Sequence, residues 1–189
     1  MLVNKPPMGW NSWNTFTRDI NETMILETAD AMVSTGLKDA GYEYLVIDDC
    51  WSERERDENG NLVASHEKFP RGMKFVADYV HSKGLKFGMY SCDGVRTCAD
   101  YPGSYGHEFQ DAEYFAKVGI DYLKYDNCYK VYNESGPMLY NRMSMALKAT
   151  GRDILFSACN WGAEDSQEWI RSTGAHMYRS TGDITDTFQ

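Results

Sequence analysis

The stretch GIDYLKYDNCY, residues 119–129, contains the pattern that decides the fold. A glycine is followed by a short β-prone run, and the run ends in polar side chains. The same order occurs in GYEYLVIDDCW from Gly41, GLKFGMYSCDG from Gly84, GRDILFSACNW from Gly151 and GAHMYRSTGDI from Gly174. Consecutive glycines are 43, 35, 32 and 23 residues apart, which leaves room for a helix between strands. The repeat therefore predicts βα units and a parallel sheet.

Helical periodicity between these runs supports the same interpretation. One apolar stripe is formed by Ala29, Met32, Val33 and Leu37, and another by Phe75, Val76, Tyr79 and Val80. We expect Asn21 to cap the first helix, and Gly84 and Gly119 to end the helices before them. PMGWNSW, residues 7–13, reads as an earlier strand, so six strands are expected in all.

The ends of the strands favour a closed barrel over an open doubly wound sheet. Each predicted strand ends in polar or aromatic side chains: Trp10 and Trp13; Asp48 and Asp49; Tyr90 and Asp93; Lys124 and Asp126; Asn160 and Trp161; Arg179 and Asp183. In a (β/α)8 TIM barrel all these ends meet at one face, whereas an open sheet shares a site only at its switch point. Since a complete barrel takes about 250 residues, we expect residues 1–189 to form about the first six βα units of a partial catalytic barrel.

Composition excludes several classes of function. The 189 residues carry a net charge of −9, which argues against nucleic-acid and anionic-membrane partners. No apolar run approaches the roughly 18 residues that a membrane span needs, and MLVNKPPMGW at the start lacks the pattern of a signal peptide. The five cysteines are an odd number, so at least one thiol is free or pairs outside the chain.

Asp126 is the first candidate catalytic residue. Strand alternation places it on the same face as Lys124, and opposite to Leu123 and Tyr125. A neighbouring ammonium lowers the pKa of a carboxyl, so we expect Asp126 to be ionised and suited to act as a nucleophile. The alternative is a structural ion pair at the end of a strand.

Asp183 is the second candidate, in RSTGDI after Arg179. Gly182 predicts a turn, which would put Asp183 on a loop above the strands, where a carboxyl can serve as a general acid. The alternative is an ordinary turn aspartate.

Asp48 and Asp49 form an adjacent pair after the apolar run YLVI. In a strand they would point to opposite faces, with one reaching the site. Ionised carboxylates accept strong hydrogen bonds from sugar hydroxyls; a cap or loop role is the alternative. The same oxygens could hold a metal, but Lys124 beside Asp126 would repel a cation, so we expect no metal.

Tryptophans complete the expected site. Trp10, Trp13, Trp51 and Trp161 all fall at strand ends, where they would offer apolar faces to a sugar or else pack beneath loops. Two carboxyls in different environments, flanking cations, an Asp pair and aromatic rings together suit glycoside hydrolysis.

The motifs MGWNSW, GYEYLVIDDCW, HSKGLKFGMYSCDG, YLKYDNC, CNWG and RSTGDI resemble, in order and spacing, the clan D α-galactosidases (melibiases) of glycoside hydrolase family 27. The resemblance runs from about residue 6 to residue 188. It implies that Asp126 is the nucleophile and Asp183 the acid/base. It also implies substrate-binding roles for Trp13, Asp48, Asp49, Tyr90, Lys124, Asn160, Trp161 and Arg179.

The resemblance further implies a retaining enzyme that releases terminal α-linked galactose from oligosaccharides or glycoconjugates and needs no metal or other cofactor. Cys98 and Cys128 match a cysteine pair that would bridge two loops, while Cys50 and Cys159 lack the partners common in secreted members. Members are often secreted or lysosomal, so the compartment stays open. The family's last two βα units and its C-terminal β-sandwich are not among these residues.

Two alternatives remain from the sequence. The first is a hydrolase of the same family for another sugar: α-N-acetylgalactosamine, β-L-arabinopyranose or isomaltose. The second is an inactive carbohydrate-binding fragment.

Overall fold

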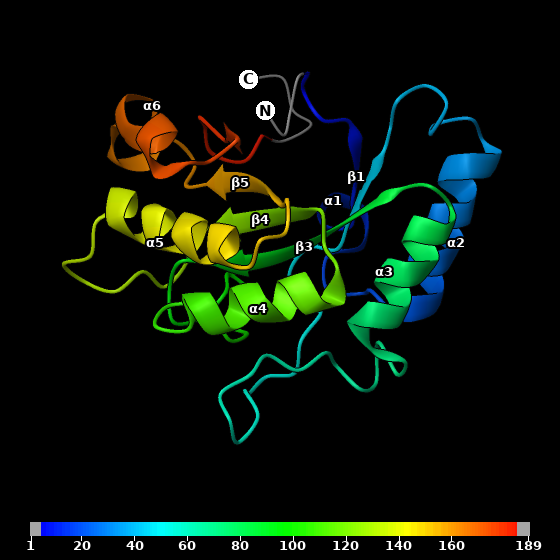
Figure 1. The fold of residues 1–189 in the computed structure, drawn as a ribbon, viewed down its shortest axis with the longest axis horizontal. Coiled ribbons are helices and arrows are strands. Elements are labelled where there is room, and N and C mark those ends of the chain that lie inside the picture. Colours follow the sequence, from blue (N-terminus) through cyan, green and yellow to red (C-terminus); the bar gives the residue numbers. More distant parts are fainter. Residues whose placement is uncertain (1–4, 185–189) are drawn as a thin grey trace.

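The computed structural model describes residues 5–184, which form one parallel sheet with helices around it (Figure 1). The strands are β1 (Gly9–Asn11), β2 (Tyr44–Val46), β3 (Lys86–Cys92), β4 (Tyr122–Asp126), β5 (Leu155–Cys159) and β6 (Met177–Tyr178). They lie side by side in chain order, and each is parallel to the next. A doubly wound sheet would reverse its order at a switch point. The unbroken order confirms the predicted barrel-type α/β architecture.

The helices follow one another around the outside of the sheet. They are α1 (Trp13–Phe16), α2 (Glu22–Ser34), α3 (Gly72–Ser82), α4 (Glu108–Val118), α5 (Gly136–Ala149) and α6 (Ser166–Trp169), with 3-10 turns η1 (Ala163–Asp165) and η2 (Ile170–Thr173). Consecutive pairs from α2 to α5 pack together. None of the helices within residues 5–184 has the length and apolar character needed to cross a membrane.

The predicted helix boundaries are confirmed at three positions. The Asn21 side chain accepts a hydrogen bond from the Met24 backbone N–H at 3.0 Å and so caps α2. Gly119 ends α4 with φ +92°, and Gly84 follows α3 with φ +70°. These left-handed conformations favour glycine, which explains why a glycine precedes β3 and β4.

One part of the first helix prediction is wrong. Because α2 begins at Glu22 and ends at Ser34, Leu37 lies beyond it and is 42% exposed. Val33 is also exposed, since the buried stripe runs through Ile25, Ala29 and Met32.

The core lies between the sheet and the helices. On β4, Leu123 and Tyr125 are fully buried. Tyr125 meets Tyr140 of α5 edge to face at 5.6 Å between ring centroids. The Tyr140 hydroxyl also donates to the Tyr125 carbonyl at 3.1 Å. Alternate residues of β4 are thus committed to the core, which leaves Lys124 and Asp126 for the other face.

An ion pair attaches the long β2–α3 connection to α4. Both terminal nitrogens of Arg56 donate to the Asp111 carboxylate at 2.7 Å, and the Asp111 side chain is completely buried. We expect Asp111→Asn to lower the free energy of unfolding by about 3–5 kcal/mol, because it leaves Arg56 without its counter-charge. Urea unfolding of the full-length protein measures this. Asp78→Asn, which breaks an exposed pair with Lys74, should cost about 0.5 kcal/mol or less; equal losses would contradict the prediction.

Candidate active site

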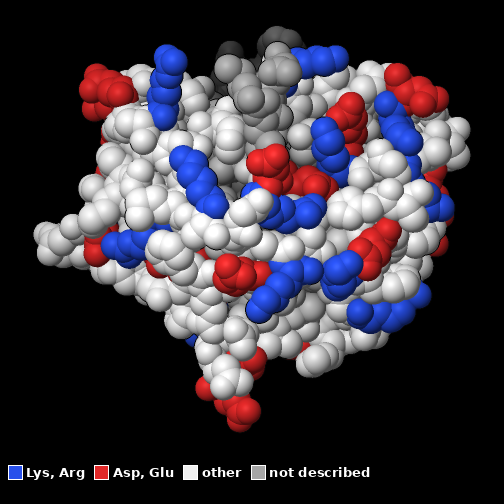
Figure 2. All heavy atoms as spheres, viewed as in Figure 1, with Lys and Arg blue, Asp and Glu red and all other residues white. Residues whose placement is uncertain are grey.

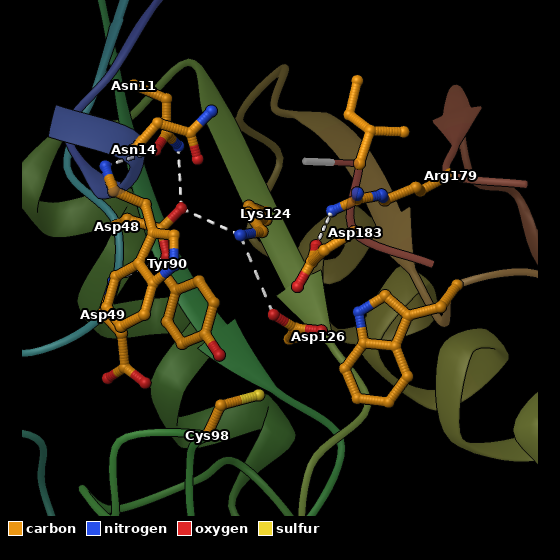
Figure 3. A pocket seen from close by; sticks show the side chains of 13 residues that line it. Asn11, Asn14, Asp48, Asp49, Tyr90, Cys98, Lys124, Asp126, Arg179 and Asp183 are labelled. Carbon is orange, nitrogen blue, oxygen red and sulfur yellow. Dashed lines mark hydrogen bonds and ion pairs between the residues drawn. The ribbon is translucent and has the colours of Figure 1, made fainter. Parts of the chain in front are cut away.

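The carboxyl ends of the strands surround a pocket of about 430 Å³, named here the strand-end pocket (Figure 3). Its lining residues are Asn11, Trp13, Asn14, Asp48, Asp49, Tyr90, Cys98, Lys124, Asp126, Trp161, Arg179, Asp183 and Ile184. They come from segments that span most of the chain. The structure therefore brings together all but one of the catalytic and substrate-binding residues that the family resemblance implies, the exception being Asn160.

Asp48 and Asp49 both line the strand-end pocket, so the prediction that they point to opposite faces is wrong. The reason is that β2 ends at Val46, and strand alternation does not extend to them. Asp48 accepts hydrogen bonds from Asn11 Nδ2 at 2.8 Å and Lys124 Nζ at 2.9 Å. These contacts fix its carboxylate at one side of the cavity.

Asp49 is held by the loop that follows β3. Its carboxylate accepts from Thr97 Oγ1 at 2.8 Å and from the Ala99 backbone N–H at 2.9 Å. Burial raises the pKa of Asp49, and these hydrogen bonds oppose that shift. The two adjacent carboxyls thus have different partners and different electrostatic surroundings.

Lys124 and Asp126 share the inner face of β4, as alternation predicts. Lys124 Nζ lies 3.8 Å from Asp126 Oδ2, farther than its 2.9 Å contact with Asp48. The expected net lowering of the Asp126 pKa is not found. Burial raises the pKa of Asp126, and Lys124 offsets this only in part. Lys124 therefore limits the rise in the Asp126 pKa that burial causes. The size of that rise cannot be predicted from the sequence.

A pH dependence follows from this balance. Lys124→Met removes the ammonium that lowers the pKa of Asp126, so that pKa rises further above its usual range. If Asp126 reacts ionised, the acid limb of the kcat/KM profile should move to higher pH. Profiles of the full-length protein measure the shift, with Lys124→Arg as the control that keeps the charge. An acid limb unmoved in Lys124→Met would contradict the prediction.

Asp183 lies in the loop beyond β6, as Gly182 predicts. Its side chain is 78% exposed, and Arg179 Nη1 contacts its carboxylate at 2.5 Å. Arg179 also donates to the Gly182 carbonyl at 2.9 Å, which steadies the turn. In Figure 3 the carboxyls of Asp126 and Asp183 are directed into the same cavity, one buried and one open to solvent.

Only two of the four strand-end tryptophans, Trp13 and Trp161, line the strand-end pocket. Trp51 is 3% exposed, donates to the Tyr90 carbonyl at 2.9 Å and stacks on Tyr114, so a sugar-facing role for it is wrong. Trp10 packs edge-on against Phe16 beside the core. Both rings therefore support the fold.

Asn160 is 2% exposed and does not line the strand-end pocket. Its amide donates to the Ala163 carbonyl at 2.8 Å and shapes the turn after β5. Trp161 follows with φ +57°, a left-handed conformation that turns the chain sharply. Asn160 thus lies outside the cavity, whereas its neighbour Trp161 lines it.

Sequence reasoning missed Asn11, Asn14 and Ile184 as lining residues. Asn11 holds Asp48 through its side chain, and its Oδ1 accepts from the Trp13 backbone N–H at 2.9 Å. A signal existed, because Asn11 is a polar residue between two strand-end tryptophans.

Cys98 and Cys128 form a disulfide, as expected, which ties the β3–α4 loop to the end of β4. Cys50, Cys92 and Cys159 are buried free thiols. The two disulfide sulfurs and an Asp126 carboxylate oxygen lie within 4.8 Å of one another. No other group of three acidic, His or Cys side chains within residues 5–184 is close enough to share a metal ion. A disulfide offers no thiolates, so this group is not a metal site in the oxidised protein.

Comparison with known proteins decides the family. Residues 5–189 match the family described as Alpha galactosidase A. The chain belongs to this family. It is 56% identical over 188 residues to an alpha-galactosidase of Cyamopsis tetragonoloba. The match covers 99% of this chain and 45% of that protein. Alpha-galactosidase 2 of Arabidopsis thaliana is 54% identical over 189 residues. That match covers 100% of this chain and 47% of the Arabidopsis protein.

Solved structures of alpha-galactosidases have the same fold. Alpha-galactosidase I from Mortierella vinacea matches with a TM-score of 0.93 and 45% identity, over 97% of this chain and 47% of that one. An alpha-galactosidase from Saccharomyces cerevisiae with raffinose matches at 0.92 and 48% identity, over 97% and 41%. The six strands therefore correspond to part of a TIM barrel, and the chain spans about half the length of the relatives it matches.

Proposed function

We propose that the whole protein is a retaining exo-glycosidase that removes terminal α-linked galactose from oligosaccharides or glycoconjugates. The observation that carries this proposal is the pair Asp126 and Asp183, which face one cavity from β4 and from the loop after β6. One is buried beside a cation and the other is exposed on a loop. Two carboxyls in different environments suit two different chemical roles.

The reaction follows from these positions. Asp126 attacks C1 of galactose while Asp183 protonates the leaving oxygen, so the glycosidic bond breaks as a galactosyl–Asp126 ester forms. Asp183, now ionised, then takes a proton from water. That water attacks C1, releases galactose and returns Asp126 as a carboxylate. Two inversions at C1 give net retention.

The other lining residues would hold the sugar. Asp48 and Asp49 present carboxylate oxygens to hydroxyl groups, while Lys124 and Arg179 donate. Tyr90, Trp13 and Trp161 supply aromatic surface to the apolar face of the ring. We assign Asn160 an indirect part, through the turn that carries Trp161.

We further propose that residues 1–189 are part of a catalytic barrel that later βα units complete, followed by a β-sandwich. Among the described strands, β1 and β6 each pair with one neighbour only. A closed barrel pairs every edge. The matched relatives are about twice as long, which leaves room for those units.

Product stereochemistry tests the proposal. Proton NMR of a fresh reaction of the full-length protein with an aryl α-galactoside should show α-galactose first, before mutarotation. β-galactose as the first product would contradict it. A panel of nitrophenyl glycosides, including α-N-acetylgalactosaminide and β-L-arabinopyranoside, identifies the sugar. Absence of turnover on all of them, with galactose still bound, would instead indicate a carbohydrate-binding protein.

A further inference from the structure

Asp93 lies directly behind the strand-end pocket, at the end of β3. The β3–β4 register sets Cys92 opposite Asp126, and the Asp93 backbone N–H donates to the Asp126 carbonyl at 2.9 Å. The side chain of Asp93 is 0% exposed and does not line the cavity. Asp93 is thus next to the proposed nucleophile but has no direct access to a sugar.

The Asp93 carboxyl lacks a hydrogen-bond partner among residues 5–184. Neither of its oxygens bonds to any group within the described part of the chain. A buried carboxylate without donors is strongly disfavoured, because desolvation of the charge is not repaid by contacts. Asp126, in contrast, has Lys124 at 3.8 Å and the Asn127 backbone N–H at 3.0 Å. Of the two carboxyls, Asp126 is the one equipped to carry charge.

Three charged groups face Asp93 from the neighbouring segments. Lys130 of the β4–α5 connection lowers its pKa, while Asp126 of β4 and Glu164 of η1 raise it. Lys130 already forms an ion pair with Glu164, so its charge is shared. Burial is the largest influence and, together with Asp126 and Glu164, it outweighs Lys130 and raises the pKa of Asp93 to about 8.

The other titratable groups around Asp93 are neutral. They are the buried thiol of Cys92 and the buried phenols of Tyr125 and Tyr140. Burial, reinforced by the nearby Asp93 carboxyl, raises the pKa of each of these groups. None of them brings a positive charge to Asp93.

We propose that Asp93 is a positioning residue for the reaction, a neutral carboxylic acid packed behind Asp126 that leaves Asp126 as the ionised member of the two. The proposal rests on the nucleophilic role proposed for Asp126. Two interacting carboxyls do not ionise independently, because the first charge opposes the second. An uncharged Asp93 therefore spares Asp126 a repulsion that would otherwise add to its burial.

Infrared difference spectroscopy of the full-length protein tests the protonation state directly. The spectrum of the wild type minus that of Asp93→Asn should contain the carbonyl stretch of a protonated carboxylic acid at neutral pH. The stretch should disappear as the pH rises into the mildly alkaline range. Its absence from the wild type at neutral pH would overturn the proposal.

Substitutions at neighbouring residues test the electrostatic coupling between Asp93 and the charges around it. This test can be made even if the Asp93→Asn variant does not fold. The midpoint at which the stretch disappears should fall in Asp126→Asn, which removes a repelling charge, and rise in Lys130→Met, which removes an attracting one. Shifts of roughly half a pH unit or more are expected. Asp165→Asn, at an exposed site, should leave the midpoint unchanged. Midpoints unmoved in both Asp126→Asn and Lys130→Met would overturn the proposal.

The two proposals fail in different ways. Because the titration needs no turnover, it remains measurable in Asp126→Asn. Full activity of that variant would remove the nucleophilic role of Asp126, and with it the positioning role of Asp93, while the carboxylic acid signal of Asp93 would still be observed. A missing carboxylic acid signal in an active enzyme would remove only the assignment of Asp93.

Discussion

Asp126→Asn is expected to lower kcat/KM for an aryl α-galactoside by roughly four orders of magnitude or more. The amide keeps the shape of the side chain, but it cannot form the ester with C1. Because Asn has nearly the same shape as Asp, and Asp126 lines the pocket at the end of β4, the substitution should leave the fold intact. Steady-state kinetics of the full-length protein measure the loss. Hydrolysis near the wild-type rate would refute the nucleophile assignment.

Azide separates loss of the nucleophile from general damage. In Asp126→Gly the space left by the carboxyl admits azide, which attacks C1 from the same side as Asp126 while Asp183 protonates the leaving oxygen. One displacement should therefore give a β-galactosyl azide. An α-galactosyl azide from this variant would place the nucleophile elsewhere.

Asp183→Ala should produce the second largest effect, and its size should depend on the leaving group. The alkoxide leaving group of an alkyl galactoside needs a proton as it departs, so kcat/KM for these substrates should fall by roughly 10²–10⁴-fold. Dinitrophenolate leaves without a proton, so formation of the galactosyl–enzyme from a dinitrophenyl galactoside should be nearly unaffected. Hydrolysis of that ester becomes slow, because no base activates water. Equal losses for both kinds of substrate would contradict the acid/base role.

The control for Asp183 again uses azide, which needs no general base. Azide should restore turnover of the dinitrophenyl substrate in Asp183→Ala and give an α-galactosyl azide after two displacements. Asp165→Asn, also an exposed aspartate, should leave both substrates unaffected. No azide product from Asp183→Ala would argue that Asp183 is not the base.

The order of the sheet could be predicted because each signal for it is local. A glycine with a left-handed backbone ends a helix, and an apolar run follows within a few residues, as at Gly119 and β4. The shared face of Lys124 and Asp126 was predictable for the same reason, since alternation within a strand needs no knowledge of its neighbours. The carboxyl ends of parallel strands then meet at one face by geometry alone.

What could not be predicted depends on where strands end and on packing between distant segments. Three residues of β2 are too few to carry alternation as far as Asp48 and Asp49. The position of Trp51 after β2 leaves open whether its ring faces a sugar or packs beneath a loop, and the structure shows it stacked on Tyr114 of α4. The net direction of the Asp126 pKa shift also differs from the prediction, because burial is a property of the assembled molecule.

The position of Lys124 has a consequence for how variants of this site can be interpreted. Its ammonium touches Asp48 at 2.9 Å and approaches Asp126 at 3.8 Å, so it joins a group that would grip the sugar to the group that would react with it. A hydroxyl that donates to Asp48 competes with Lys124 for that carboxylate, and so it alters the electric field at Asp126. Affinity and reactivity therefore share one electrostatic element, and substitutions at Asp48 should change KM and kcat together.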